Sequence, residues 1–337
     1  MKEKSKVRVT RRSFLKSTGG ALAGVSLGTG YLFGCAKEPH PAETTTSGRG
    51  KIMQRRVLGK TEEQLSIIGF GGIIVSGVEQ SQANEFVREA IDRGINYFDV
   101  APTYGNAEER LGPALEEFRK DVFLACKTTK RDKEGAAAEL RESLKKLRTD
   151  HFDLYQLHAM TTEVDLRKAM GPGGAIEAFV EAREKGLVRY LGFSAHSAEI
   201  ALALMDQFDF NTILFPVNWV CYFNAGFGPQ VIAKAEEKGM GRLALKAMAQ
   251  TTIKKGEEKE YKKCWYKPVT DPEETDLALR FTLSEPITAA IPPGDIRLFR
   301  KALDIADRFQ PMTDVERNTL KQRAAGLEPI FRLKSVS

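Results

Sequence analysis

Hydrophobic positions follow two alternating periods along this chain from about residue 65 onward. Short runs rich in β-branched and aromatic residues are separated by longer segments whose apolar residues recur with the period of a helix. The eight expected strands are 65–72, 97–102, 122–128, 152–160, 188–196, 212–219, 242–249 and 287–294. Because a helix-period segment follows each strand, the pattern predicts an α/β fold with a parallel sheet.

The number of units favours a closed barrel over an open, doubly wound sheet. Eight strand-and-helix units are typical of a (β/α)8 TIM barrel, whereas a doubly wound sheet more often has five to seven units and a Gly-x-Gly-x-x-Gly turn. The first strand ends in GFGG at 69–72, a weak match to that turn. We expect Ser81 to cap the first helix, and Gly94, Gly186 and Gly239 to end three helices.

Three segments lie outside the eight units but belong to the same predicted domain, residues 51–330. Residues 54–61 are expected to form a small hairpin beneath the barrel, and residues 314–327 a final amphipathic helix. The long segment 250–270 follows the seventh strand, so it should overhang the C-terminal face, where barrels place their active sites. It is either a solvated basic loop or, because it carries Trp265 and Tyr266, a lid or substrate wall.

The positive charge of the chain is confined to its N-terminus. The formal net charge is +6, but residues 1–35 hold seven Lys or Arg and one acid, which leaves 44 basic and 44 acidic residues in the remainder. A neutral body has no broad positive field for phosphate backbones, so we expect no nucleic-acid partner.

The N-terminal segment resembles a twin-arginine export signal over residues 1–35. Arg11 and Arg12 are followed by Ser-Phe-Leu-Lys and then by a glycine-rich apolar run. The run ends at Cys35 in a sequence similar to a bacterial lipobox, so lipid attachment there and an unlipidated form both stay open. Residues 36–50 read as a linker. We expect the export machinery as a partner, and a location in the periplasm or on the outer face of the cytoplasmic membrane.

The four cysteines give no metal-binding pattern. Cys35, Cys126, Cys221 and Cys264 share no Cys-x-x-Cys spacing, so we expect a site without metal. In an oxidising compartment Cys221 and Cys264 could pair, and free thiols are the alternative.

Four chemically complementary side chains fall at the ends of three successive predicted strands. Asp99 and Tyr104 follow the second strand, Lys127 ends the third, and His158 lies near the end of the fourth. Since the C-terminal ends of barrel strands face one shared pocket, these side chains should converge there.

The convergence suits proton transfer to a carbonyl that receives a hydride. Tyr104 can donate the proton, and the Lys127 ammonium is expected to lower the pKa of its phenol. Asp99 would hold Lys127 in place. His158 can hydrogen-bond the carbonyl oxygen and polarise it as negative charge develops. These four residues are the predicted catalytic group.

The same four residues at these intervals resemble the aldo-keto reductase family over roughly residues 53–310. The resemblance implies a (β/α)8 barrel that binds NADPH, with NADH as the alternative, and acts on small-molecule carbonyl substrates. It also implies cofactor contacts at four positions, which are Ser194, Trp219, Lys246 and Arg297.

Several usual cofactor positions of the family are altered in this chain. Ala195 replaces an Asn that contacts the nicotinamide amide, where His196 could substitute, and Pro216 replaces a Gln. Lys246 stands where a Ser is common and could meet the diphosphate as a cation.

Two other functions stay open at this point. Barrels also host Schiff-base lyases, in which Lys127 or Lys246 would attack a carbonyl. Alternatively, an exported barrel could bind a cofactor or ligand without turnover. The sequence does not indicate the physiological substrate.

Overall fold

A computed structural model describes residues 53–333 and shows a barrel of eight parallel strands. In chain order the strands are β3 (Phe70–Gly71), β4 (Tyr97–Asp99), β5 (Phe123–Thr128), β6 (Phe152–Met160), β7 (Val188–Ala195), β8 (Thr212–Pro216), β9 (Gly241–Leu245) and β12 (Ala289–Ile291). Each strand pairs in parallel with the next. A parallel bridge between Ile68 and Ala290 joins the last strand to the first, so the fold is the predicted (β/α)8 TIM barrel.

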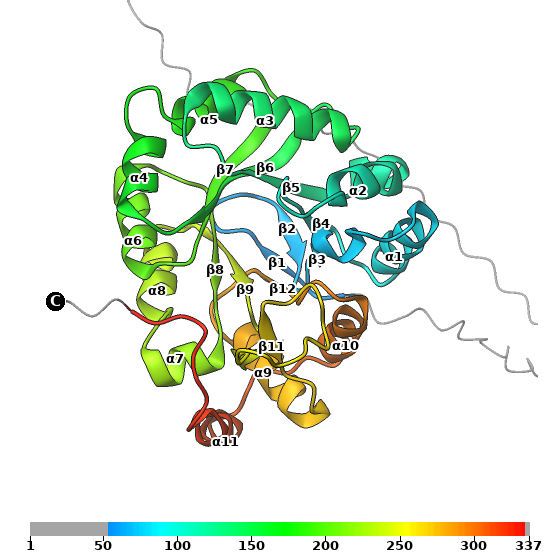
Figure 1. Cartoon of the computed structure of the whole chain (residues 1–337), viewed down its shortest axis with the longest axis vertical. Coiled ribbons are helices and arrows are strands. Elements are labelled where there is room, and N and C mark those ends of the chain that lie inside the picture. The colour runs from blue at the N-terminus through cyan, green and yellow to red at the C-terminus, as the bar shows by residue number, and fades with distance from the viewer. Residues whose placement is uncertain (1–52, 334–337) are drawn as a thin grey trace, which may run out of the picture. The chain divides into compact units, whose positions relative to one another are not determined.

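The helices lie around the outside of the strands (Figure 1). They are α1 (Gln80–Asp92), α2 (Ala107–Leu115), α3 (Lys133–Lys146), α4 (Glu163–Met170), α5 (Ala175–Glu184), α6 (Ala198–Gln207), α7 (Trp219–Ala225), α8 (Pro229–Glu237), α9 (Pro272–Ser284), α10 (Ile296–Asp307) and α11 (Asp314–Ala324). Two 3-10 turns, Gly72–Val75 and Glu116–Asp121, complete the connections.

Alternation along each strand separates an inner and an outer core. In β6, Leu154 packs in the cluster that fills the barrel, whereas Tyr155 and Leu157 belong to the larger cluster beneath the helices. Because side chains on a strand alternate between faces, Gln156 and His158 share the inward face with Leu154. The apolar filling of the interior therefore ends in polar residues near the C-terminal ends of the strands.

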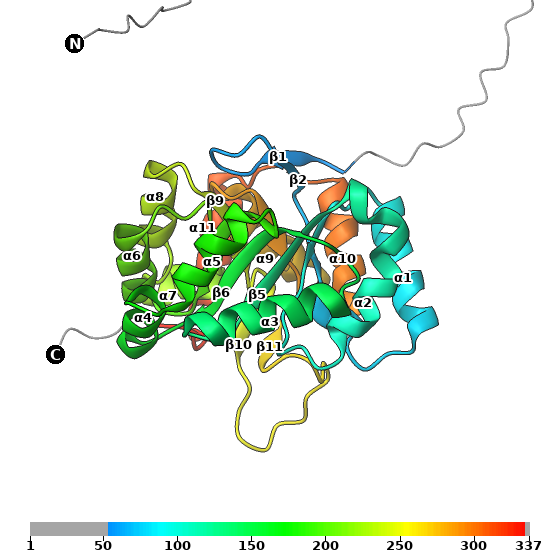
Figure 2. The same ribbon diagram turned by 90° about the horizontal axis from the view of Figure 1, so that it is seen from above.

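Two small hairpins lie at opposite ends of the barrel (Figure 2). β1 (Arg55–Val57) pairs with β2 (Gln64–Ser66), and Leu58 and Leu65 of this hairpin are fully buried in the inner cluster. At the other end, β10 (Ala249–Thr252) pairs with β11 (Tyr266–Pro268). The first hairpin lies where one was expected and closes that end, but it extends to Ser66, so the start of the barrel strand expected at 65–72 belongs to the hairpin instead. The second hairpin lies at the end that carries the polar residues.

Some predicted boundaries were wrong for local reasons. The strand expected at 212–219 ends at Pro216, because Asn218 accepts a hydrogen bond from the backbone N–H of Cys221 at 3.0 Å and starts α7. The strand expected at 242–249 ends at Leu245, since Lys246 has a positive φ of 67°. The segment 250–270 contains strand residues of β10 and β11 rather than being loop throughout.

The helix signals were partly right. Gly94, Gly186 and Gly239 have positive φ, as expected for residues that end helices. Ser81 is not the cap of α1, because Glu79 occupies that position and forms a reciprocal capping box with Gln82. The final helix α11 was predicted correctly, although it is three residues shorter than expected.

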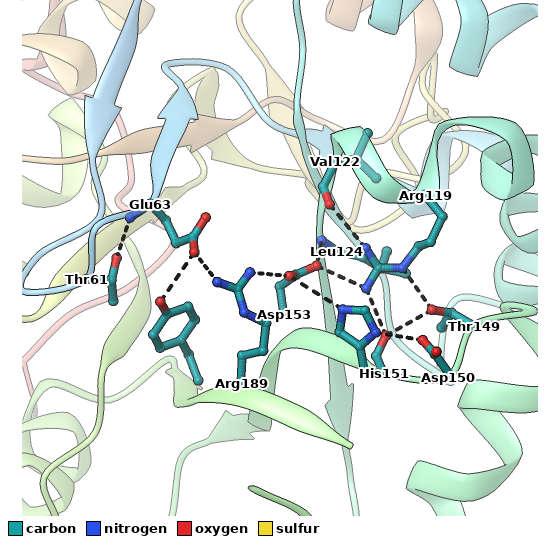
Figure 3. Close-up of polar contacts among 11 residues, drawn as sticks. Thr61, Glu63, Arg119, Val122, Leu124, Thr149, Asp150, His151, Asp153 and Arg189 are labelled. Atoms are coloured by element: carbon teal, nitrogen blue, oxygen red, sulfur yellow. Dashed lines mark hydrogen bonds and ion pairs between the residues drawn. The ribbon is translucent and has the colours of Figure 1, made fainter. Parts of the chain in front are cut away.

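Polar contacts link strands β5, β6 and β7 at the end of the barrel that carries the β1–β2 hairpin (Figure 3). The carboxylate of Asp153 on β6 accepts a hydrogen bond from the backbone N–H of Leu124 at 2.9 Å. It also pairs with Arg119 at 3.0 Å and with Arg189 at 2.7 Å. Arg189 in turn pairs with Glu63, just before β2. The Asp153 side chain is only 5% exposed, so its oxygens depend on these donors.

We therefore expect Asp153→Asn to lower the free energy of unfolding by about 1–3 kcal/mol, because it leaves two partly buried guanidinium groups without their shared carboxylate. Urea denaturation of the full chain measures this change. Arg167→Gln is the matched control, since it breaks only the exposed pair with Glu163 and should cost less than about 0.5 kcal/mol. Equal effects of the two substitutions would contradict the role of Asp153.

The predicted signal at residues 1–35, Cys35 and the linker at 36–50 lie outside the described residues. Among the helices of residues 53–333, none is both long and apolar enough to cross a membrane.

Candidate active site

A buried pair of opposite charges lies at the C-terminal ends of β4 and β5. The ammonium of Lys127 donates to a carboxylate oxygen of Asp99 and to the carbonyl of Val100 at 3.1 Å. The other oxygen of Asp99 accepts from the Gln156 amide at 3.2 Å and the Tyr97 hydroxyl at 3.4 Å. Both charged side chains are at most 2% exposed. Asp99 thus holds Lys127 in place as predicted, and two further donors hold Asp99.

Tyr104 lies beside this pair on the segment between β4 and α2. The ammonium of Lys127 is 5.3 Å from the centroid of the Tyr104 ring. The His158 ring meets the Tyr104 ring edge-on, with centroids 5.9 Å apart. The structure therefore brings all four predicted catalytic residues together.

One electrostatic expectation was wrong. Burial raises the pKa of the Tyr104 phenol more than the nearby Lys127 charge lowers it, so the net shift is upward. The phenol thus keeps its proton at neutral pH, which suits a group that donates a proton to a developing oxyanion. For Lys127, burial lowers the pKa, but Asp99 and Tyr104 outweigh it and the net shift is upward.

His158 lies near the end of β6, next to a residue with a strained backbone. Several contacts hold this segment in place. Its carbonyl accepts from Arg131 at 2.6 Å, and its Nδ1 is 3.5 Å from the Thr103 hydroxyl. The next residue, Ala159, has a positive φ of 51°, and its N–H donates to the Ser194 hydroxyl at 2.8 Å. Burial, and then the charge of Lys127, lower the pKa of His158 to about 3. The imidazole is therefore a neutral hydrogen-bonding group.

This shift predicts a pH-dependent contribution to stability. Below pH 6.5 the unfolded chain protonates His158, whereas the folded chain does not until about pH 3, so stability is lost as the pH falls through this window. We expect wild-type protein to lose about 1–3 kcal/mol more than His158→Gln between pH 7 and pH 4. Urea denaturation at both pH values measures the difference, and parallel losses would contradict it.

Two supporting residues were missed at the sequence level. Gln156 had a signal, because it lies two positions before His158 and so shares its face of the strand. Arg131 had none, since it lies in the connection between β5 and α3 and contacts the His158 carbonyl of β6, 27 positions away.

The four predicted catalytic residues line a cavity of about 220 Å³. Ser194, His196 and Lys246 from later strand ends also line it, together with residues 291–294. Residues 263–266 of the hairpin segment form another wall, as the lid interpretation of 250–270 expected. Burial, and then the charge of Lys246, lower the pKa of His196 to about 4, so this ring is neutral as well.

The predicted cofactor residues divide into two groups. Ser194 and Lys246 line the cavity, but Trp219 and Arg297 do not. Trp219 is fully buried at the start of α7 in a separate apolar cluster, so its indole is not free to stack on a ligand in this conformation. Arg297 donates to both carboxylate oxygens of Asp295, at 2.9 and 3.0 Å, and stacks on Tyr261.

The residues present fit the nicotinamide of a nicotinamide nucleotide better than they fit its phosphates. Ser194 and His196 supply hydrogen-bonding groups beside the catalytic residues. Arg297 and Arg300 at the start of α10 are engaged by Asp295 and Glu89. Lys246 is the predicted cofactor cation that remains in the cavity wall.

The remaining expectations concern thiols, metals and a Schiff base. Cys126, Cys221 and Cys264 are free and buried, so the pairing of Cys221 with Cys264 is not formed. No cluster of His, Cys, Asp and Glu in residues 53–333 could hold a metal ion. Lys127 is paired with Asp99 and its pKa is raised, which disfavours it as a Schiff-base nucleophile.

Comparison with known proteins gives partial sequence matches. Uncharacterized oxidoreductase YqkF of Bacillus subtilis is 36% identical over 157 residues, which cover 42% of this chain and 49% of that protein. L-galactose dehydrogenase of Arabidopsis thaliana is 27% identical over 215 residues, which cover 58% of this chain and 66% of that protein. The chain thus spans about half to two thirds of the length of these two relatives.

The fold and the family match more completely. The holo form of an aldo-keto reductase from Bacillus halodurans superposes with a TM-score of 0.65 at 22% identity, covering 84% of this chain and 99% of that one. At this identity the likeness concerns the fold alone. The Aldo/keto reductase family model matches residues 67–310, a range that includes all four predicted catalytic residues. The chain therefore belongs to the aldo/keto reductase family.

Proposed function

We propose that this protein reduces aldehydes or ketones to alcohols with NADPH, with NADH as the alternative hydride donor. One observation carries the proposal. The Tyr104 phenol lies against the buried Lys127–Asp99 pair and the neutral His158, and all four line one cavity. This arrangement presents a proton donor and a hydrogen-bonding group to a single carbonyl oxygen.

The residues of this chain account for the proton half of the reaction. A carbonyl oxygen between Tyr104 and His158 accepts a hydrogen bond from each side chain and is polarised by them. A bound reduced nicotinamide would supply a hydride to the carbonyl carbon. Tyr104 then donates its hydroxyl proton to the oxygen, and the adjacent Lys127 cation stabilises the phenolate that remains.

The assay for this activity uses the purified full chain with a panel of aldehydes and ketones. Absorbance at 340 nm follows oxidation of NADPH and NADH, and nucleotide fluorescence measures their binding. Saturable binding and turnover support the proposal. Saturable binding without turnover favours an exported barrel that only binds a cofactor or ligand, and absence of both contradicts the proposed reductase.

We further propose that the protein is exported folded by the twin-arginine pathway and carries its cofactor with it. The paired arginines Arg11 and Arg12 motivate this, since the pathway transports folded proteins. The protein would reside in the periplasm or on the outer face of the cytoplasmic membrane, with lipid on Cys35 as the anchor. Cell fractionation of Arg11→Lys/Arg12→Lys should find the double variant retained inside, and mass spectrometry of native protein reports bound nucleotide and lipid.

A further inference from the structure

Lys246 lies in the wall of the cavity and has no negatively charged partner among the described residues. The Nζ atom of Lys246 lies 5.4 Å from the centroid of the Trp265 ring and 5.0 Å from that of Tyr266. Among residues 53–333 no carboxylate pairs with it, whereas Lys127 has Asp99 and Lys263 donates to the carbonyl of Ile74 at 2.7 Å. The aromatic rings stabilise the ammonium, but they leave its hydrogen bonds available to a ligand.

The backbone holds Lys246 in this position at a cost. Its φ of 67° lies in the left-handed region, which a non-glycine residue rarely adopts. The Lys246 carbonyl accepts from the Asn218 amide and from the N–H of Ala249, both at 3.0 Å. Asn218 also donates to the Ala249 carbonyl at 2.7 Å, so one buried side chain fixes both ends of this turn. The lysine is therefore positioned by the fold.

The rest of the cavity offers this cation no compensation. Of the described residues that line it, Asp99 is the only acid, and it already pairs with Lys127. Burial lowers the pKa of Lys246 to about 8, so the amine is still mainly protonated at pH 7. A desolvated cation without a counter-ion is unfavourable, and a bound anion would offset that penalty.

The size of the cavity limits the ligand that it can enclose. At about 220 Å³ it is smaller than the roughly 300–1,000 Å³ of pockets that enclose drug-sized ligands. Tyr104 and Lys246 both line this space, with residues 263–266 across it. A small molecule that fills this space can therefore contact both the proton donor and the free ammonium.

We propose that Lys246 binds a carboxylate or phosphate group of the carbonyl substrate, so that the preferred substrates are anionic aldehydes or ketones. This assignment rests on the reductase function proposed above and names the substrate class of the same site. It gives Lys246 a role other than holding the cofactor diphosphate.

The test compares acids with their neutral esters. The full chain is assayed with 4-carboxybenzaldehyde and its methyl ester, and with 4-oxobutanoate and its methyl ester. We expect wild-type protein to prefer at least one acid over its ester by about 10- to 100-fold in kcat/KM, as a charge-assisted contact predicts. In Lys246→Met that preference should fall towards one, and Lys246→Arg should keep most of it.

Lys267→Met is the matched control. Lys267 lies in β11 next to Tyr266 but outside the cavity, and its ammonium pairs with Glu257 at 3.0 Å. This variant should keep the acid preference. Absence of an acid preference in wild-type protein, or its persistence in Lys246→Met, would overturn the proposal. An equal loss with acid and ester, matched by weaker NADPH binding, would assign Lys246 to the cofactor diphosphate instead and also overturn it.

A binding measurement separates this proposal from the reductase function. The chain has two tryptophans, and because Trp219 is fully buried, ligand-induced changes in fluorescence should report mainly Trp265 beside Lys246. If no carbonyl is reduced, titration with 4-(hydroxymethyl)benzoate and its methyl ester still tests the subsite. Saturable binding of the acid alone, abolished in Lys246→Met, supports it, and equal or absent responses refute it.

Discussion

Tyr104→Phe should lower kcat for carbonyl reduction by about 100- to 10,000-fold, the usual contribution of a positioned general acid. The substitution removes one hydroxyl and keeps the ring that lies against Lys127 and His158. The carbonyl oxygen would then lose the phenol that donates its proton. Single-turnover measurements at 340 nm report the loss at the chemical step.

Tyr222→Phe is the control for this experiment. Tyr222 lies in α7 with its ring edge-on to Phe281, and its buried hydroxyl has no hydrogen-bond partner among the described residues. We expect its kcat to stay within about twofold of wild type, because no polar contact is lost. Nucleotide binding to Tyr104→Phe should also persist. If Tyr104→Phe retained more than a tenth of the wild-type kcat, Tyr104 would not be the proton donor.

Lys127→Met should have the largest effect on stability, lowering the free energy of unfolding by about 3–5 kcal/mol. It leaves the Asp99 carboxylate buried with only the neutral donors Gln156 and Tyr97. Carbonyl reduction should also fall sharply, since the phenolate of Tyr104 loses its neighbouring cation. Urea denaturation of the full chain measures the stability and the reductase assay measures the activity.

A double variant separates lost charge compensation from lost packing. Asp99→Asn/Lys127→Met removes both charges, so it should recover part of the stability lost in Lys127→Met. Its activity should remain low, because the proton donor still lacks the cation. A double variant that is less stable than Lys127→Met would show that the unpaired carboxylate is not the cause of the destabilisation.

Much of the barrel could be predicted because its strands are short and buried on both faces. The strand at Phe152–Met160 was predicted with the correct bounds, since eight of its nine residues are apolar, aromatic or inward-facing polar groups between two clear breaks. Strand ends were less predictable. Pro216 and Leu245 end their strands through a cap at Asn218 and a left-handed residue at Lys246, which the hydrophobic pattern does not reveal.

The convergence of the four predicted catalytic residues could be predicted for a related reason. Asp99, Lys127 and His158 lie at strand ends, and strands of a parallel barrel end at one face. The positions of the predicted cofactor residues relative to the cavity were harder to predict. These residues lie in segments whose course depends on contacts with distant parts of the chain. Trp219 was placed on a strand in sequence but begins a helix that packs against α9 and α11.

The sequence by itself determined the fold class and indicated that Asp99, Tyr104, Lys127 and His158 converge, because the order of strand and helix patterns along the chain implies parallel strands that end at one face. Tertiary structure alone decided the environment of those residues. The upward shift of the Tyr104 pKa comes from burial, and the unpaired state of Lys246 comes from the hairpin and strand ends around it. Desolvation and charge pairing depend on groups far apart in the chain, so they appear only once the barrel is closed.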